Sequence, residues 1–244
     1  MDKIKESLVF VVVVVLTVLF LHLVALFFEK KVFPQQIRSV SRTKKLSLTA
    51  MFAALSGVLM SFEVPLPFAP PFYQLDISEL PILMLSLYLG PVAGVSGELL
   101  KVLVKLLIKG TSTAFVGDFA NFLIGVSMIL PATLFYHWRK TLKRAIWSLV
   151  LGSAVMTVFG SMLNAFYLVP KFAVMFGLPL EAIIAMGTAV NSSITSLNTL
   201  VLYAVVPFNL LKSFIVSFLT YFLYKRVEKI LFKEKPMKSD AAVK

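Results

Sequence analysis

Pro207-Phe208-Asn209-Leu210-Leu211-Lys212 begins the last of six or seven apolar stretches in this chain, each predicted to be long enough to cross a bilayer. From Ser213 to Tyr224 this stretch contains no Asp, Glu, Lys or Arg. Hydrocarbon holds no water, so a polar side chain inside it needs a partner in the protein or in a ligand. The apolar stretches therefore decide the fold, and the few polar residues within them are the best sequence evidence for function.

The amino-acid composition indicates that most of the chain is surrounded by lipid and not by water. Hydrophobic residues make up 59% of the 244 residues, charged residues 15%, and the mean hydropathy is +0.90. A soluble domain of this size could not bury so much apolar surface. We therefore predict an all-α, polytopic membrane protein with no appended soluble domain.

The net charge of +12 could indicate nucleic acid binding, but the distribution of charge argues against it. Lys and Arg cluster at the ends of the apolar stretches, as the positive-inside rule requires, so membrane lipid is the expected partner. The chain has no cysteine and only two histidines, His22 and His137. Disulfides, thiol nucleophiles and a histidine-rich metal site are excluded.

The first apolar stretch, Val9 to Phe28, has the length of a full span and ends in Glu29-Lys30-Lys31 without an Ala-x-Ala cleavage signal. We interpret it as a retained transmembrane helix rather than a signal peptide. The expected organisation is then an extra N-terminal helix with a basic linker (1–45), a six-helix membrane domain (46–226) and a basic tail (227–244).

Three basic segments set the expected orientation in the cell membrane. They are 29–45, 137–144 and the region after Tyr224, and all three are predicted to be cytoplasmic, which puts the N-terminus outside. Segment 63–78 has no Lys or Arg and is rich in proline, so we expect a stiff, extended external loop. Segment 171–206 is expected to be external and partly helical.

The helices of the membrane domain are expected at 46–62, 77–89, 92–108, 117–136, 146–169 and 207–224. Gly90-Pro91 should separate the second from the third. Asp76 lies three residues before Glu79, which resembles a capping box. Asp118 follows Gly117 and is predicted to be a helix N-cap.

Three polar residues are candidates for holding a ligand. Asn209 and Lys212 lie three residues apart and share a helix face. The alternative for Lys212 is that its ammonium reaches the lipid headgroups. Asn164 lies near the outer end of its span, and its alternative role is a hydrogen bond between helices.

Other patterns leave their alternatives open. Lys101, Lys105 and Lys109 form a stripe; we expect Lys101 and Lys109 to meet headgroups, water or Glu98, and Lys105 stays open. Phe72 and Tyr73 could stack on a flat ring or belong to an interfacial aromatic belt. A further stripe of small residues would admit either a partner helix or a helix of the same chain. It consists of Ala50, Ala54 and Gly57.

Motifs for catalysis and nucleotide binding are missing from the sequence. It contains no Walker A sequence, no Ser/His/Asp set and no HExxH. An intramembrane enzyme would need paired carboxylates or a metal cluster, which Asp118 and Glu98 alone do not supply. An ion-coupled carrier would usually show broken helices in repeated halves. Neither alternative is favoured. Because no nucleotide-binding motif is present, uphill transport would draw its energy from an ion gradient or another subunit.

Several motifs between Leu46 and Tyr224 together carry a family resemblance. They are Ala50-x-x-x-Ala54, Pro67-Phe68, Asp76-Ile77-Ser78-Glu79-Leu80-Pro81, Leu89-Gly90-Pro91-Val92-Ala93-Gly94, Gly110-Thr111 to Asn121-Phe122, Asn164 before Pro170, and Pro207 to Lys212. With these the chain resembles the substrate-binding S components of energy-coupling factor (ECF) vitamin transporters, and among them the riboflavin-specific type.

The resemblance implies a six-helix fold with a vitamin pocket on the outer side. It assigns Asn164, Asn209 and Lys212 to the ribityl chain and ring edge, and the loop around Phe68, Phe72 and Tyr73 to covering the isoalloxazine. Asp76 and Asn121 join the expected ligand-binding set. Ala50, Ala54 and Gly57 would meet a transmembrane coupling subunit, which works with two ATPases. Riboflavin, or FMN as the alternative, would be cargo and not a cofactor.

Overall fold

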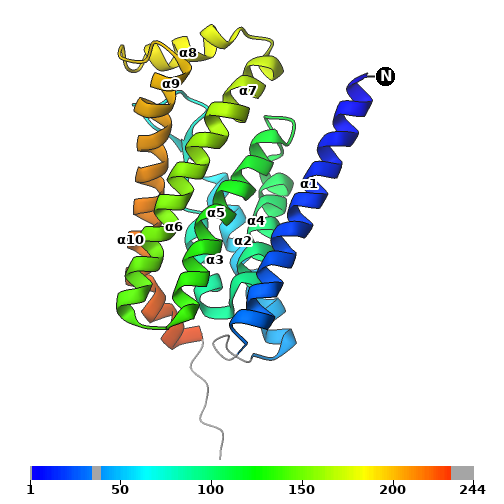
Figure 1. The fold of residues 1–244 in the computed structure, drawn as a ribbon, viewed down its shortest axis with the longest axis vertical. Helices are drawn as coiled ribbons and strands as arrows, with labels where there is room; N and C mark the ends of the chain where they lie inside the picture. The colour runs from blue at the N-terminus through cyan, green and yellow to red at the C-terminus, as the bar shows by residue number, and fades with distance from the viewer. Residues whose placement is uncertain (1, 35–39, 232–244) are drawn as a thin grey trace, which may run out of the picture.

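A bundle of helices forms the body of the molecule in the computed structural model, which describes residues 2–34 and 40–231 (Figure 1). The helices of the bundle are α2 (Arg42–Ser61), α3 (Glu79–Leu89), α4 (Pro91–Lys109), α5 (Val116–Trp138), α6 (Leu142–Leu163) and α10 (Val206–Leu231). An extra helix, α1 (Asp2–Phe27), followed by a π-helical turn, η1 (Phe28–Val32), lies beside them. This is the all-α arrangement of six helices plus one that the sequence predicts.

Four segments of the described chain are long and apolar enough to cross a membrane. They are 7–32, 116–138, 143–176 and 197–224. Helix α4 has 19 residues but carries Glu98 and three lysines. Helix α3 has only 11 residues, so the expectation that every apolar stretch is long enough to span is wrong for this one. Every residue of α3 is buried, because neighbouring helices enclose it on all sides.

Two helices run farther than the sequence indicates, and both contain a proline. Helix α6 continues through a π-helical turn, η2 (Asn164–Leu168), into α7 (Val169–Phe176). The last helix begins at α9 (Leu197–Leu200) and passes through η3 (Val201–Val205) into α10, so its predicted start at Pro207 is wrong. Pro170 and Pro207 each follow a π-turn, which relieves the clash of the ring with the carbonyl four residues earlier. Asn164, the polar residue within the expected span 146–169, is the first residue of η2.

One end of the bundle, here called the loop end, is covered by irregular and short helical segments. The loop between α2 and α3 contains two paired antiparallel strands, β1 (Val64–Pro65) and β2 (Gln74–Leu75). Helices α7, α8 (Leu180–Thr188) and α9 lie above it (Figure 1). Ala69 and Tyr73 from the loop share an apolar cluster with residues of α7 to α10. The loop is therefore packed against the bundle and not free in solvent.

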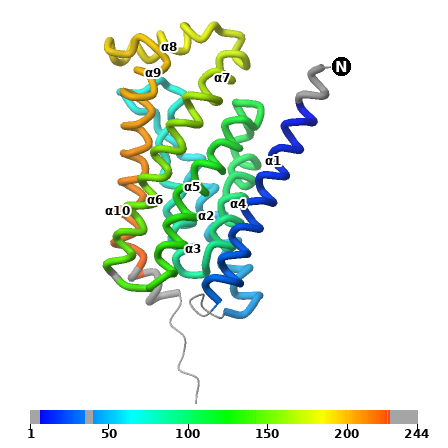
Figure 2. The backbone as a smooth tube through the Cα atoms, viewed as in Figure 1, coloured from blue at the N-terminus to red at the C-terminus, as the bar shows by residue number. Residues whose placement is uncertain are grey.

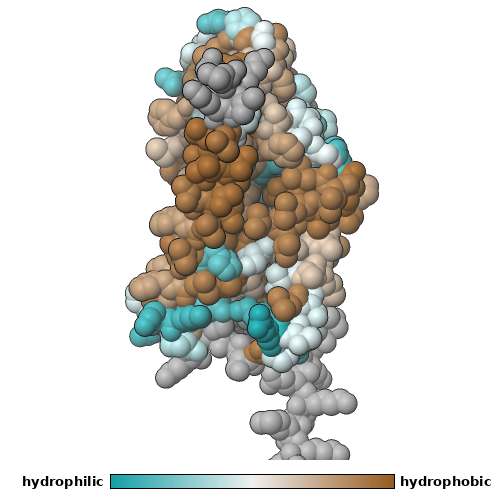
Figure 3. All heavy atoms as spheres, turned by 90° about the vertical axis from the view of Figure 1, so that its right-hand side faces the viewer, coloured by the Kyte–Doolittle hydropathy of each residue, from teal (hydrophilic) through white to brown (hydrophobic). Residues whose placement is uncertain are grey.

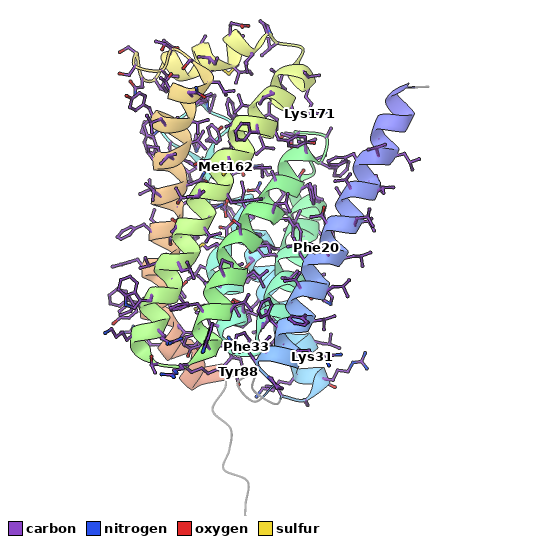
Figure 4. All side chains as sticks on the ribbon, in the orientation of Figure 1. Phe20, Lys31, Phe33, Tyr88, Met162 and Lys171 are labelled. Atoms are coloured by element: carbon purple, nitrogen blue, oxygen red, sulfur yellow. The ribbon has the colours of Figure 1, made fainter. Side chains whose placement is uncertain are left out.

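The opposite end, here called the basic end, gathers the described parts of all three basic segments. Lys31 lies there with Tyr88, whereas Lys171 lies toward the loop end (Figure 4). Above the basic end, the face that carries α1 shows a broad apolar band (Figure 3). An apolar band next to a polar rim is the surface that a bilayer requires. Residues 35–39 and 232–244, which include Arg38 and most of the predicted tail, lie outside the described residues.

Helix α1 contacts the bundle mainly through its second half and diverges from it toward the N-terminus (Figures 1 and 2). Ala25 is fully buried against residues of α2, α4 and α5. Glu29, in η1, pairs with Lys45 of α2 at 2.5 Å and accepts a hydrogen bond from the Val92 backbone N–H of α4 at 3.2 Å. The extra helix is thus fastened at the basic end by an acid that contacts two helices of the bundle.

Candidate functional site

Lys212 lies at the centre of a buried ionic cluster near the loop end. Its Nζ is 2.9 Å from Asp76 Oδ2 and 3.1 Å from Glu79 Oε1. Asp76 belongs to the loop before α3, Glu79 begins α3, and Lys212 comes from α10. All three side chains are at most 4% exposed. The ion pairs therefore join the loop and two helices in an environment without water.

The cluster continues from Glu79 into α4. Lys101 Nζ lies 3.2 Å from the same Glu79 Oε1 and 2.7 Å from Glu98 Oε2. Neither Lys101 nor Glu98 has any exposed side-chain surface. Gly125 of α5 lies directly over Glu98, where a Cβ would collide with the carboxylate. Acids and bases alternate along the five members, which are Asp76, Lys212, Glu79, Lys101 and Glu98.

The alternative for Lys212, an ammonium that reaches the headgroups, does not hold, because its ammonium pairs inside the bundle. The expectation for Asp76 is wrong. Asp76 forms no capping box: Ser78 is the residue before α3, and Asp76 Oδ1 accepts a hydrogen bond from the Ser78 backbone N–H at 2.8 Å. Burial would raise the pKa of the Asp76 carboxyl, but Lys212 and Lys101 outweigh burial and hold that pKa below its usual value.

Asn164 contacts the loop and its own helix. Its Oδ1 accepts a hydrogen bond from the Tyr73 hydroxyl at 2.8 Å, and its Nδ2 donates to the Gly160 carbonyl at 2.8 Å. The alternative of a bond between two helices is therefore replaced by a bond from helix to loop. Burial raises the pKa of Tyr73, which keeps its hydroxyl a donor. The π-turn that starts at Asn164 brings this side chain to the loop.

Asn209 lies on α10 one turn before Lys212 and is 2% exposed. A Cβ on Gly160 would lie 3.0 Å from its Nδ2, so α6 and α10 approach closely here. Within the described residues, Asn209 Nδ2, Ser78 Oγ and Glu79 Oε2 have no hydrogen-bond partner. A buried polar atom without a partner costs free energy that a ligand could restore.

Aromatic rings of the loop lie next to these polar atoms. The Tyr73 ring is 4.6 Å from Phe72 and 5.5 Å from Phe208, between ring centroids. Phe72 also meets Phe172 of α7 edge-on at 6.0 Å. Phe68 and Phe72 are half-buried at the edge of the same apolar cluster. The structure brings these rings together with Asn164, and it does so inside the loop end and not in a surface belt.

The other charged candidates form separate pairs. Lys105 Nζ is 2.6 Å from Asp118 Oδ1. Asp118 lies in the first turn of α5 and is not its N-cap, because the N-cap residue is Phe115. Lys109 pairs with Glu63 and not with Glu98. Asn121 is half-buried, and in residues 2–34 and 40–231 its side chain forms no hydrogen bond. Among the described residues, no hydrogen bond connects Asn121 with Lys212 or Asn164.

The small residues of the stripe on α2 differ in exposure. Ala50 and Ala54 are exposed, together with Met51 and Leu55. Gly57 is buried, and a Cβ there would collide with Val104 of α4 at 2.5 Å. Packing within the chain accounts for Gly57, so only the two alanines are left as candidates for a partner face.

A groove lies elsewhere, on the outer surface between α6 and α10. Its volume is about 650 Å³, and it is lined mainly by apolar side chains such as Val150, Phe214 and Phe218. The buried polar atoms around Lys212 do not face it. A ligand with both a flat ring and hydroxyl groups needs the convergent donors and acceptors of the loop end, so we assign the candidate site there.

Sequence reasoning gave no functional role to Glu79, Glu98 or Lys101. The spacing of Glu98 and Lys101 by three residues in an apolar helix was the available signal, since ionisable residues inside a membrane usually face the bundle and pair. Glu79 could not be found this way, because its two lysine partners come from distant parts of the chain. In the described residues no group of His, Cys, Asp and Glu could hold a metal ion.

Comparison with known proteins shows to which family the chain belongs. Residues 44–224 match the family model of the ECF transporter, substrate-specific component. The riboflavin transporter RibU of Staphylococcus aureus is 33% identical over 79% of this chain and 95% of its own length. The riboflavin transporter FmnP of Bacillus subtilis is 30% identical over 72% of this chain and 87% of its own.

A solved structure agrees with this assignment. It was described as the S component of a bacterial ECF transporter, and it superposes with a TM-score of 0.62 at 30% identity. The match covers 79% of this chain and all of the other. The matched family range begins after α1 and ends within α10, so it contains the complete ionic cluster. The chain therefore belongs to the family of substrate-specific components of ECF transporters, which are multi-pass membrane proteins.

Proposed function

We propose that this chain binds riboflavin at the loop end, as the substrate-binding subunit of an ATP-driven ECF importer. The observation that carries the proposal is the meeting of Asn164, Asn209, Lys212 and the loop aromatics in one buried place. Two similar proteins are named riboflavin transporters, which supports the choice of ligand. Family membership supports transport in preference to catalysis.

The side chains of the site suit the two halves of riboflavin. Phe72, Tyr73 and Phe208 offer apolar rings to the isoalloxazine, which gains from stacking. Asn209 Nδ2 offers a free donor, and Lys212 offers its ammonium, to carbonyl and hydroxyl oxygens. Ser78 Oγ and Glu79 Oε2 offer acceptors to ribityl hydroxyls. Binding would replace the Tyr73–Asn164 bond and part of the Lys212–Asp76 pair by contacts with the ligand.

The test of this function is titration of the purified protein with riboflavin. We expect quenching of flavin fluorescence at stoichiometric protein, and no comparable response with thiamin or biotin. Competition with FMN distinguishes the free vitamin from its phosphate. A protein that leaves riboflavin fluorescence unchanged but binds another vitamin would be an S component of different specificity. Ion-dependent uptake without any ATPase would instead favour a stand-alone carrier.

The exposed part of α2 is the proposed contact with the coupling subunit. Ala50 and Ala54 are small and lie among exposed apolar side chains, which allows close approach of another membrane helix. We expect Ala54→Trp to block assembly with the coupling subunit and its two ATPases by steric overlap. Riboflavin binding to the isolated subunit should survive, because the site lies elsewhere. The control is Leu107→Trp on α4, which is already 87% exposed. Normal uptake by Ala54→Trp would contradict this face.

The proposed orientation places the basic end in the cytoplasm and the loop end outside. It rests on the gathering of Lys and Arg at one end. The membrane domain would then comprise 46–226, with 1–45 and 227–244 as additions. A cysteine at Ser41, exposed at the basic end, should react only with a reagent on the cytoplasmic side. A cysteine at Ser192, exposed beyond α8, should react from outside. Labelling of both from one side would reject the topology.

A further inference from the structure

We propose that Glu79, Lys101 and Glu98 are positioning residues for Lys212, which they hold charged and directed at the ligand site. This inference rests on the proposed riboflavin site, in which Lys212 touches the ligand. Lys101 and Glu98 lie on α4 and belong to no part of the ligand-binding set. They act through Glu79, whose Oε1 lies between the two ammonium groups at 3.1 and 3.2 Å.

Because Glu79 Oε1 contacts both ammonium groups, the position of the Lys212 ammonium depends on Lys101. With both lysines present, Glu79 divides its attraction between them, and Glu98 supplies the second partner that Lys101 needs. Without Lys101, Glu79 would interact with Lys212 alone. Glu98 would also lose its ammonium partner, so both acids would draw the Lys212 ammonium toward α3 and α4 and away from Asn209, because opposite charges attract strongly where water is excluded.

The number of charges in the cluster supports the proposal that its other members position the Lys212 ammonium. It contains three carboxylates and two ammonium groups, all at most 4% exposed. One negative charge is in excess, so each ammonium has an acid on both sides. Removing Lys101 leaves two negative charges in excess, and removing Lys101 together with the Glu98 charge restores one. Charge balance therefore predicts which variants keep the site and which lose it.

A second buried pair on the same helix provides a matched control. Lys105 lies one turn beyond Lys101 on α4 and pairs with Asp118, and its side chain is 10% exposed. Lys105 also donates a hydrogen bond to the Gly110 carbonyl, and among the described residues the pair has no hydrogen bond or ion pair with a member of the Lys212 cluster. Loss of the control pair should lower stability as any lost buried pair does, while leaving Lys212 in place.

The experiment measures riboflavin affinity and thermal unfolding for four purified full-length variants. We expect Lys101→Met to weaken riboflavin binding by roughly tenfold or more, which is the size of effect that one lost buried charge contact gives. The double variant Lys101→Met/Glu98→Gln should bind more tightly than Lys101→Met alone, although it lacks a further charged side chain. Glu98→Gln should weaken binding less than Lys101→Met does, because Lys101 keeps its pair with Glu79, and the control Lys105→Met/Asp118→Asn should bind nearly as the wild type.

Recovery by removing a second charge is a result that mere damage to the fold would not give. A Lys101→Met protein that binds riboflavin as the wild type overturns the proposal. So does a double variant no better than Lys101→Met, or a control that loses affinity to the same extent. If Lys101→Met does not fold, the double variant and Glu79→Gln provide the test. Glu79→Gln should weaken riboflavin binding, and an unchanged riboflavin affinity of Glu79→Gln rejects its role in positioning Lys212.

A ligand-free measurement separates this proposal from the assignment of riboflavin. Lys101→Met and Lys212→Met should be non-additive in thermal unfolding, because both ammonium groups share Glu79 Oε1. Additive shifts would reject the coupling even if riboflavin binds. A wild type that ignores riboflavin while the two shifts are non-additive would reject the proposed ligand and leave the positioning of Lys212 supported.

Discussion

Lys212→Met is expected to lower the free energy of unfolding by about 3–5 kcal/mol, as removal of one partner from a buried ion pair usually does. Asp76 Oδ2 and Glu79 Oε1 both lose the ammonium that lies within 3.1 Å of them. The loop that carries Asp76 then loses its ionic contact with α10. We therefore also expect riboflavin binding to fall below detection. Thermal unfolding in detergent, followed by fluorescence titration, measures both effects.

Lys109→Met is the control for this prediction. Lys109 pairs with Glu63, but its side chain is 44% exposed, so solvent screens the interaction. Exposed pairs contribute at most about 1 kcal/mol, and the unfolding midpoint should barely change. Equal midpoints for Lys212→Met and Lys109→Met would show that the Lys212 cluster does not stabilise the fold. Undisturbed riboflavin binding in Lys212→Met would remove this lysine from the site.

The second large effect is expected for the two asparagines, and it should differ between them. Asn209→Leu removes a buried donor that has no partner among the described residues. Replacing it with a side chain of similar shape should leave the unfolding midpoint unchanged or higher. Riboflavin loses a donor, which costs about 1–3 kcal/mol, or roughly five- to 150-fold in the dissociation constant.

Asn164→Leu should lower both affinity and stability. Its amide already pairs with Tyr73 and Gly160, so its loss leaves the buried Tyr73 hydroxyl without a partner and takes one of two donors from the Gly160 carbonyl. Asn198→Ala, an exposed position on α9, is the control for general damage. Calorimetric titration and thermal unfolding of the same preparations provide the comparison. A stability loss in Asn209→Leu as large as in Asn164→Leu would mean that Asn209 has a structural role.

The two asparagines illustrate why a residue can be retained against stability. An unpartnered donor in a buried position is unfavourable for the folded protein alone. It becomes favourable when a ligand supplies the acceptor. Binding sites are where such local conflicts are expected, because the missing partner is the ligand. Asn209 fits this description, whereas the paired Lys105 and Asp118 do not.

Sequence alone determined the class of fold and predicted several residues of the candidate site. Apolar stretches specify membrane helices because lipid leaves the backbone no other way to satisfy its hydrogen bonds. Gly90 and Pro91 specify the break between α3 and α4, which the structure confirms. The scarcity of polar residues in these stretches was enough to select Asn164, Asn209 and Lys212, because each such residue is costly and needs a reason.

Tertiary structure decided which polar groups meet. The shared oxygen of Glu79 joins lysines from α4 and α10, more than a hundred residues apart, and no local spacing encodes that contact. The same holds for Tyr73 with Asn164, and for Gly57, whose size fits Val104 of the neighbouring helix. Helix ends at Phe176 and Leu197 were missed because a π-turn lets a helix pass a proline that local rules treat as a boundary. Periodicity and composition are local properties of a chain, whereas pairing of buried charges depends on how the helices pack.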